Sequence, residues 1–195
     1  MPQHPIYTIG HGTRSIIELL SLLKRFSIDF LLDVRSRPYS KFNPQYNREH
    51  LAASLDRENI KYIYMGDVLG GHPSDTSCYK IDGKVDYELV RQKDFFKKGI
   101  ERIRTAYEKD LKVVLLCSES KPAGCHRSRL IGTELHRQKI LVQHIDESGA
   151  LRDQEYPGTM GTLWQHPAVT PTQTPHDALP SLQTPGENLY PPDNI

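Results

Sequence analysis

The sequence predicts an α/β fold: an open, mostly parallel sheet of about five strands with helices on both faces. Short apolar runs alternate along the chain with segments whose apolar residues recur at helical spacing. Two of these runs, 30–35 and 112–117, are largely apolar, as parallel strands are when helices cover both sides of a sheet. Such alternation is typical of strands joined by right-handed helical crossovers.

The expected elements follow from these patterns in chain order. Strands are expected at 6–10, 30–35, 61–66, 112–117 and 141–146, and helices at 16–26, 47–59, 86–110 and 126–138. Ser15 and Glu18 have the spacing of a capping box, which predicts the start of the first helix. Asn47 is expected to cap the second helix, and Gly99 is a candidate break in the third.

The chain divides by composition into a domain, 1–150, and a tail, 151–195. The tail is rich in Pro, Thr and Gln and lacks apolar periodicity, so we expect it to be extended or disordered. It is either inert or a proline-rich segment that docks on a partner.

Composition excludes several classes of protein. The net charge of +1 gives no basic signature, so binding to extended duplex nucleic acid is not expected. Three cysteines, Cys78, Cys117 and Cys125, do not make a disulfide framework and fit a reducing compartment. No apolar run approaches the roughly 20 residues that span a bilayer. We therefore expect a cytoplasmic protein without a membrane partner.

Unusual residues follow four of the predicted strands. In an open parallel sheet, ligands bind beyond the carboxyl ends of the strands, which all lie at one edge. The residues expected at that edge are Gly10, His11, Asp33, Arg35, Arg37, Gly70, Gly71, Cys117, Glu119, Cys125, His126 and Arg127. Their convergence predicts a polar pocket.

Arginines give this pocket its expected preference for anions. Guanidinium groups suit phosphate, sulfate or carboxylate, and Arg127 lies in the first turn of a predicted helix, where free N–H groups also attract anions. Arg35 and Arg37 follow the neighbouring strand. The alternative is that Arg127 or Arg35 pairs internally with Asp33 or Glu119.

The cysteines and histidines are candidates for the chemistry. Cys125, at a helix N-terminus beside His126 and Arg127, is a candidate nucleophile, whereas Cys117 ends a buried strand and reads as a core residue at the pocket floor. His11 or His126 could transfer protons. A zinc site would need about four N or S ligands, and no paired C-x2-C spacing is present, so no metal is predicted.

The carboxylates Asp33 and Glu119 are expected to orient the arginines or to act in acid–base catalysis. Gly10, beside His11, is expected to let the backbone approach the ligand closely, and Gly70 and Gly71, after the third strand, are further ligand-binding candidates. The residues do not identify a cofactor.

Two resemblances bear on function. The order strand, cysteine, loop, Gly-x-x-Arg-Ser, helix is similar to the anion loops of rhodaneses and cysteine phosphatases, although here a longer loop follows Cys117. The segments YTIGHG, LLDVRSRPYSKFNPQYN, YMGDVLGG and LLCSESKPAGCHRSRLIGTEL, followed by VQHI, resemble the DUF488 family over about residues 6–146. That resemblance implies an α/β fold and a shared polar site, and its D-V-R-x-x-P-x-S pattern adds Ser40 to the ligand-binding candidates.

Besides a purely structural zinc or interaction domain, three functions remain open at this point. The first is an enzyme on a phosphate-bearing or other anionic substrate, such as a nucleotide or a nucleic-acid end. The second is cysteine-dependent sulfur or phosphoryl transfer, as in rhodaneses or phosphatases. The third is a non-catalytic module that binds nucleotides or nucleic acid. The number of reactive residue types favours an enzyme.

Overall fold

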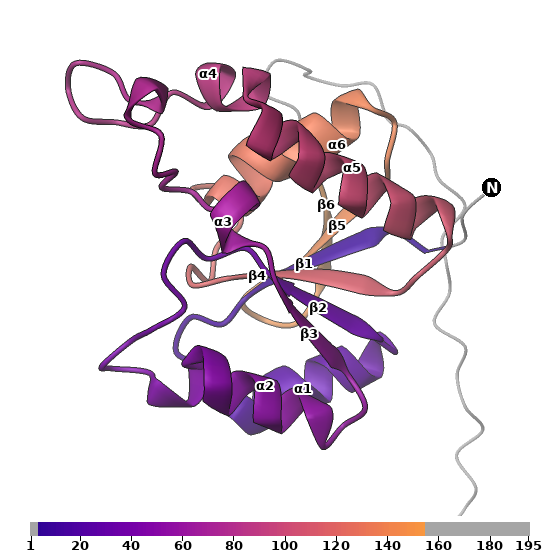
Figure 1. Cartoon of the computed structure of the whole chain (residues 1–195). Helices are drawn as coiled ribbons and strands as arrows, with labels where there is room; N and C mark the ends of the chain where they lie inside the picture. The colour runs from indigo at the N-terminus through magenta and orange to yellow at the C-terminus, as the bar shows by residue number, and fades with distance from the viewer. Residues whose placement is uncertain (1–3, 155–195) are drawn as a thin grey trace, which may run out of the picture. The chain divides into compact units, whose positions relative to one another are not determined.

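The computed structural model describes residues 4–154, which form a six-stranded sheet in the order β3-β2-β4-β1-β5-β6 (Figure 1). The strands are β1 (Ile6–Gly10), β2 (Phe30–Asp33), β3 (Lys61–Tyr64), β4 (Val113–Cys117), β5 (Val142–Ile145) and β6 (Leu151–Asp153). The first five are parallel, and β6 runs antiparallel to β5. The predicted α/β class and mostly parallel sheet are therefore confirmed.

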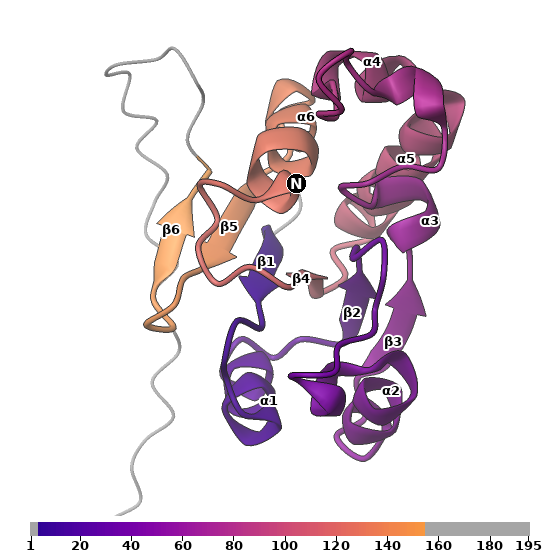
Figure 2. The ribbon, with the colours of Figure 1, turned by 90° about the vertical axis from the view of Figure 1, so that its left-hand side faces the viewer.

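Helices cover both faces of the sheet, as expected (Figures 1 and 2). One face carries α1 (Ile16–Arg25) and α2 (Arg48–Asp56), and the other carries α3 (Gly66–Leu69), α4 (Tyr87–Gln92), α5 (Asp94–Glu108) and α6 (Thr133–Arg137). Short helical turns lie at Pro44–Tyr46 and Thr76–Cys78.

Alternating side chains of β4 separate two apolar cores. Val114 and Leu116 belong to the core beneath α1 and α2, whereas Val113 and Leu115 belong to the core beneath α5 and α6. Successive side chains of a strand point to opposite faces, so a fully buried β4 needs apolar residues at consecutive positions. This central strand ends at Cys117.

The N-terminus of α1 has the predicted capping box. The Ser15 hydroxyl accepts from the Glu18 N–H at 3.2 Å, and the Ser15 N–H donates to the Glu18 carboxylate at 2.6 Å. At α2 the prediction is only half right. Asn47 is the residue before the helix, but its side chain accepts from the Ser40 N–H at 2.7 Å and makes no capping bond.

The predicted helix 86–110 is wrong as a single element. It is two helices, α4 and α5, separated at Lys93, whose backbone is extended. Gly99 does not mark the break and lies inside α5, where a Cβ would come within 2.7 Å of Leu69 Cδ2. The glycine serves close packing of α5 on α3.

The predicted helix 126–138 is also irregular. It begins as a π-helix, Arg127–Gly132, and continues as α6. The Thr133 hydroxyl donates to the Ser128 carbonyl at 3.2 Å, five residues back. Single π-helical turns are rare and occur often at functional sites.

The C-terminal end of the described chain adds a strand that the sequence did not predict. β6 has only three residues, all exposed, so its sequence carries no burial pattern. The chain divides into units Met1–Gly158 and Thr159–Ile195, and residues 155–195 lie outside the described part. The expected extended or disordered tail and its docking partner therefore stay predictions. Within the described residues, no helix combines the length and apolarity that crossing a bilayer requires.

A buried histidine at the β1–β5 contact predicts a pH dependence of stability. His144 Nδ1 lies 2.6 Å from the Thr8 hydroxyl, and its Nε2 lies 2.8 Å from Gln154 Oε1. Burial lowers its pKa to about 4 from an ordinary value near 6.5. The unfolded chain therefore takes up this proton at a higher pH than the folded chain.

We expect the free energy of unfolding to be highest above about pH 6.5 and to fall as the pH is lowered from there to about 4. The loss attributable to His144 is on the order of 1–3 kcal/mol. Urea denaturation at several pH values checks this, with His144→Gln as the comparison. An equally steep decline in the variant would assign it to other groups.

Candidate functional site

A cleft of about 900 Å³ opens at the carboxyl ends of β2 and β4. Its walls are Arg35, Ser36, Arg37, Gly71, His72, Tyr79, Lys80, Gly83, Lys84, Val85, Tyr87, Cys117, Ser118, Glu119, His126 and Arg129. This is the edge at which the sequence predicts a pocket. Six of the predicted site residues line it: Arg35, Arg37, Gly71, Cys117, Glu119 and His126.

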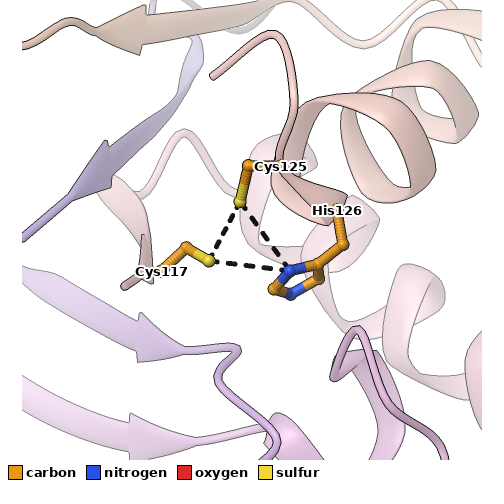
Figure 3. A group of neighbouring side chains, drawn as sticks. All are labelled: Cys117, Cys125 and His126. Atoms are coloured by element: carbon orange, nitrogen blue, oxygen red, sulfur yellow. Dashed lines mark hydrogen bonds between the residues drawn. The ribbon is translucent and has the colours of Figure 1, made fainter. Parts of the chain in front are cut away.

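Two thiols and an imidazole lie close together after β4, and two of these residues, Cys117 and His126, line the cleft (Figure 3). The Cys125 Sγ donates a hydrogen bond to the Cys117 Sγ at 2.9 Å. His126 Nδ1 lies 3.6 Å from the Cys117 Sγ and 3.8 Å from the Cys125 Sγ. His126 Nε2 lies 3.0 Å from the Val34 carbonyl, which can only accept, so Nε2 carries a proton. Nδ1 therefore faces the sulfur atoms, and it can accept a thiol proton when the ring is neutral or donate to a thiolate when the ring is protonated.

The two cysteines differ in exposure and in acidity. Cys117 lines the cleft, whereas Cys125 is fully buried and is not part of the lining. The hydrogen bond from Cys125 is the largest cause that lowers the pKa of Cys117, and it outweighs the opposing effect of burial, with His126 acting in the same direction. The same bond, together with burial, raises the pKa of Cys125. The pair therefore favours loss of the proton from Cys117 before Cys125.

This arrangement places Cys117, and not the predicted nucleophile Cys125, in the cleft lining. A helix N-terminus beside His and Arg favours Cys125 as the nucleophile, but the turn into the π-helix buries it. Cys117 ends β4 and is also nearly buried, at 4% exposure, yet its side chain reaches the cleft floor.

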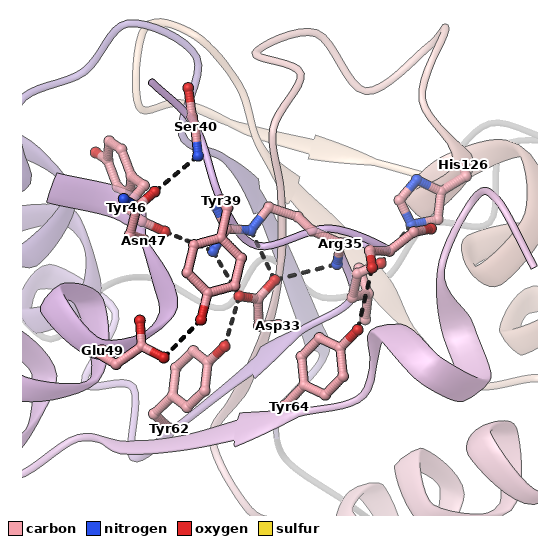
Figure 4. Close-up of polar contacts among 12 residues, drawn as sticks. Asp33, Arg35, Tyr39, Ser40, Tyr46, Asn47, Glu49, Tyr62, Tyr64 and His126 are labelled. Atoms are coloured by element: carbon pink, nitrogen blue, oxygen red, sulfur yellow. Dashed lines mark hydrogen bonds and ion pairs between the residues drawn. The ribbon is translucent and has the colours of Figure 1, made fainter. Parts of the chain in front are cut away.

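Asp33 and Arg35 form a closed internal pair (Figure 4). Arg35 donates from Nε at 2.8 Å and from Nη2 at 2.6 Å to the two carboxylate oxygens, and Nη2 also donates to the Tyr46 carbonyl. The Tyr62 hydroxyl donates to Asp33 at 2.8 Å, and burial with the nearby carboxylate raises the pKa of Tyr62. Of the two predicted roles for Arg35, internal pairing with a carboxylate is therefore the one that the structure has. Arg35 lines the cleft, but its charge is balanced by Asp33.

Arg127 is turned away from the cleft and holds the loop that follows β4. It is fully buried, and its guanidinium donates to the carbonyls of Glu119 and Ser120. Gly10 leaves the space for this contact, since a Cβ there would overlap the Glu119 carbonyl oxygen at 1.7 Å. Arg127 and Gly10 thus shape the loop 118–124 instead of lining the cleft.

The remaining predicted residues also lie outside the lining. His11 stacks on Tyr46 with ring centroids 4.2 Å apart, and burial is the main cause that lowers its pKa. The Ser40 hydroxyl accepts from the N–H groups of Phe42 and Asn43 and so closes its own loop. Gly70 packs against the Gly66 carbonyl, while Gly71, in the lining, packs on the His126 ring.

The cleft is rich in cations. Within residues 4–154, neither the Arg37 nor the Arg129 guanidinium makes a hydrogen bond or ion pair, so both charges are available. Lys84 pairs with Asp82 at 3.3 Å, and Lys80 lies 3.9 Å from Asp86. Glu119 is the acidic residue of the lining.

The segment 79–87 supplies the wall that residue patterns did not identify. The long glycine-punctuated stretch 68–85 suggested a functional loop, but nothing marked individual positions within it. The structure pairs Tyr79 with Val85 across a tight turn and so brings Lys80, Lys84 and Tyr87 to the cleft.

Cys117, Cys125 and His126 could offer three ligand atoms to a metal, all within 4.8 Å of one another. Two thiolates on one tetrahedral zinc, at Zn–S distances near 2.3 Å, would lie roughly 3.8 Å apart. The observed 2.9 Å between the sulfur atoms is shorter and fits a thiol hydrogen-bonded to a thiolate.

Comparison with known proteins gives a family and no reaction. The model of the domain of unknown function DUF488 matches residues 15–133, which contain β2, β3, β4 and the cysteine pair. The match confirms the resemblance noted in the sequence. No curated protein and no solved structure matches the chain.

Proposed function

The chain belongs to the DUF488 family, whose description names no reaction. From the site itself, we propose that the protein is an enzyme that binds an anionic substrate in the cleft. The Cys117 thiolate attacks this substrate. The observation that carries this proposal is the position of Cys117. The Cys117 Sγ accepts a hydrogen bond from the Cys125 thiol at 2.9 Å. It also lines a cleft that holds the Arg37 and Arg129 guanidinium groups, which are unpaired within residues 4–154.

The residues divide the work as follows. Arg37 and Arg129 would hold the negative charge of the substrate, which a phosphate, sulfonate or carboxylate group provides. The Cys117 thiolate would form the covalent bond, because a thiolate is the nucleophilic form of cysteine. His126 Nδ1, at 3.6 Å from that sulfur, or Glu119 would carry a proton to or from the leaving group.

A non-catalytic module for nucleotides or nucleic-acid ends is the competing function. It would use the cations of the cleft in the same way, but it would not need the thiolate. Burying a charged thiolate is unfavourable unless it has hydrogen-bond partners, and Cys125 supplies such a partner to Cys117. Binding alone would give no reason to stabilise a thiolate at this position. The cysteine pair therefore favours the enzyme.

Removing the two free guanidinium groups is expected to weaken anion binding. Phosphate, pyrophosphate, sulfate and thiosulfate, tested separately, should raise the Tm of the wild-type protein in proportion to their affinity. Each arginine should contribute about tenfold or more to affinity, since hydrogen bonds to charged groups are worth roughly 1.5–3 kcal/mol. The double variant Arg37→Gln/Arg129→Gln should therefore lose most of the shift.

The matched control is Arg57→Gln, which removes an exposed arginine at the end of α2, outside the cleft. It should respond to the anions as the wild type does. Equal shifts in the double variant and the control, or no shift in the wild type with any anion, would contradict an anion site at the cleft.

A further inference from the structure

We propose that Cys125 is a resolving thiol, which displaces the covalent intermediate from Cys117, and that the cleft therefore acts on anionic substrates whose electrophilic atom is sulfur. This inference rests on the proposed role of Cys117. It adds the class of bond that reacts and a second reacting residue.

The positions of the two sulfur atoms carry the inference. Cys117 is reached from the cleft, whereas Cys125 lies outside the lining and is fully buried. Substrate and Cys125 therefore approach Cys117 Sγ from different sides. Displacement at sulfur needs the attacking group and the leaving group on opposite sides of the central sulfur atom. The positions of Cys125 and the cleft relative to Cys117 Sγ provide this geometry.

The distance between the thiols suits a disulfide that forms and reopens. The Sγ atoms are 2.9 Å apart, and a disulfide bond is about 2.05 Å long, so they need to approach by less than about 1 Å. Cys78, the remaining cysteine, is buried in the core that contains α5 and has no such neighbour among the described residues.

The first step breaks the sulfur–sulfur bond of the substrate. The Cys117 thiolate attacks one sulfur of an anionic disulfide, a Cys117–sulfur bond forms, and the disulfide bond of the substrate breaks. The first product leaves as a thiolate and takes a proton from solvent. Arg37 and Arg129 hold the anionic part of the substrate during this step and favour the departing negative charge.

The second step involves Cys125. His126 Nδ1, 3.8 Å from the Cys125 Sγ, accepts the Cys125 proton, and the new thiolate attacks Cys117 Sγ. The Cys117–Cys125 bond forms, the mixed disulfide breaks, and the second product leaves with the proton held by His126. The substrate gains two electrons, and the cysteine pair loses two. A cellular dithiol then reduces the pair for another cycle.

A phosphorus electrophile would make no use of this neighbour. A phosphocysteine is released when water attacks phosphorus, so a thiol behind the cysteine sulfur would assist only the first attack, through its hydrogen bond, and not the release. A resolving role for the buried Cys125 therefore fits sulfur chemistry better than phosphorus chemistry.

The test uses the reduced full-length protein and oxidised glutathione as the anionic disulfide. Intact-mass and peptide-mapping mass spectrometry follow the products with time. Wild type and Cys78→Ser are expected to form the Cys117–Cys125 disulfide and release both glutathione halves. Cys125→Ser and Cys125→Ala should accumulate glutathione on Cys117, with a mixed-disulfide lifetime at least about tenfold longer, because the intramolecular attack is lost. Cys117→Ser should form neither product.

Two results would overturn the inference, and they separate it from the proposed function. If wild type accumulates the Cys117 mixed disulfide as long as the folded Cys125 variants do, Cys125 does not resolve, while Cys117 keeps its nucleophilic role. If wild-type Cys117 reacts with neither glutathione nor iodoacetamide, both proposals fail. Of Cys125→Ser and Cys125→Ala, the variant whose Tm matches that of wild type is folded and is the one to compare with wild type.

Discussion

Cys117→Ser is expected to abolish alkylation of the folded protein by iodoacetamide at pH 6, whereas Cys78→Ser leaves it intact. Cys117 is the thiol that lines the cleft, and the hydrogen bond from Cys125 is the main cause that lowers its pKa. Cys78 is fully buried, and burial raises its pKa. Peptide mapping after a short pulse of reagent should therefore find the label on Cys117 alone in wild type.

The pH dependence of this reaction makes the expectation quantitative. A free thiol with a pKa near 8.5 loses reactivity roughly a hundredfold between pH 8 and pH 6, as its thiolate disappears. Because the pKa of Cys117 is lowered, its thiolate persists across this range, and its rate should change by less than about threefold. A rate that falls in parallel with that of the urea-unfolded protein would show that Cys117 is an ordinary thiol.

Arg127→Met is expected to lower the free energy of unfolding by roughly 3–5 kcal/mol, the largest effect on stability that the site predicts. The fully buried guanidinium donates to two carbonyls in the loop after β4, and methionine would fill similar space without donating. Two partly buried carbonyls would then lose their donor, at about 1–3 kcal/mol each.

Urea denaturation of Arg127→Met beside Arg57→Met measures this effect. The control removes an exposed arginine, so its change should stay within about 0.5 kcal/mol. A loss below about 1 kcal/mol in Arg127→Met would mean that the loop does not depend on this side chain. Such a result would reopen the idea that Arg127 faces a ligand.

Much of the fold could be predicted because its signals are local. The capping box at Ser15 and the apolar run of β4 each follow from neighbouring residues. The break at Lys93 could not be predicted, because an amphipathic pattern continues across it and the interruption comes from how α4 and α5 pack. Strand β6 was missed because three exposed residues pair with β5 without any burial pattern.

The site could be located from the sequence but not resolved into facing residues. Parallel topology brings the segments after β2 and β4 to one edge, so the general position follows from the order of strands. Which side chains reach the cleft depends on the turn from Cys125 into the π-helix, which buries Cys125 and Arg127 and leaves Arg129 at the surface. Lys80 and Lys84 reach the cleft through a turn whose sequence marks no individual position.

The central claim, a Cys117 thiolate in a cationic cleft, is tested most directly by comparing two alkylating reagents that differ in charge. Iodoacetate is an anion and iodoacetamide is neutral, so the ratio of their rates at Cys117 reports the potential at the sulfur atom. We expect this ratio to be at least about tenfold higher in the folded protein than in the unfolded chain, at low salt, and to fall in Arg37→Gln/Arg129→Gln. A ratio equal to that of the unfolded chain, unchanged by the two substitutions, would contradict the account.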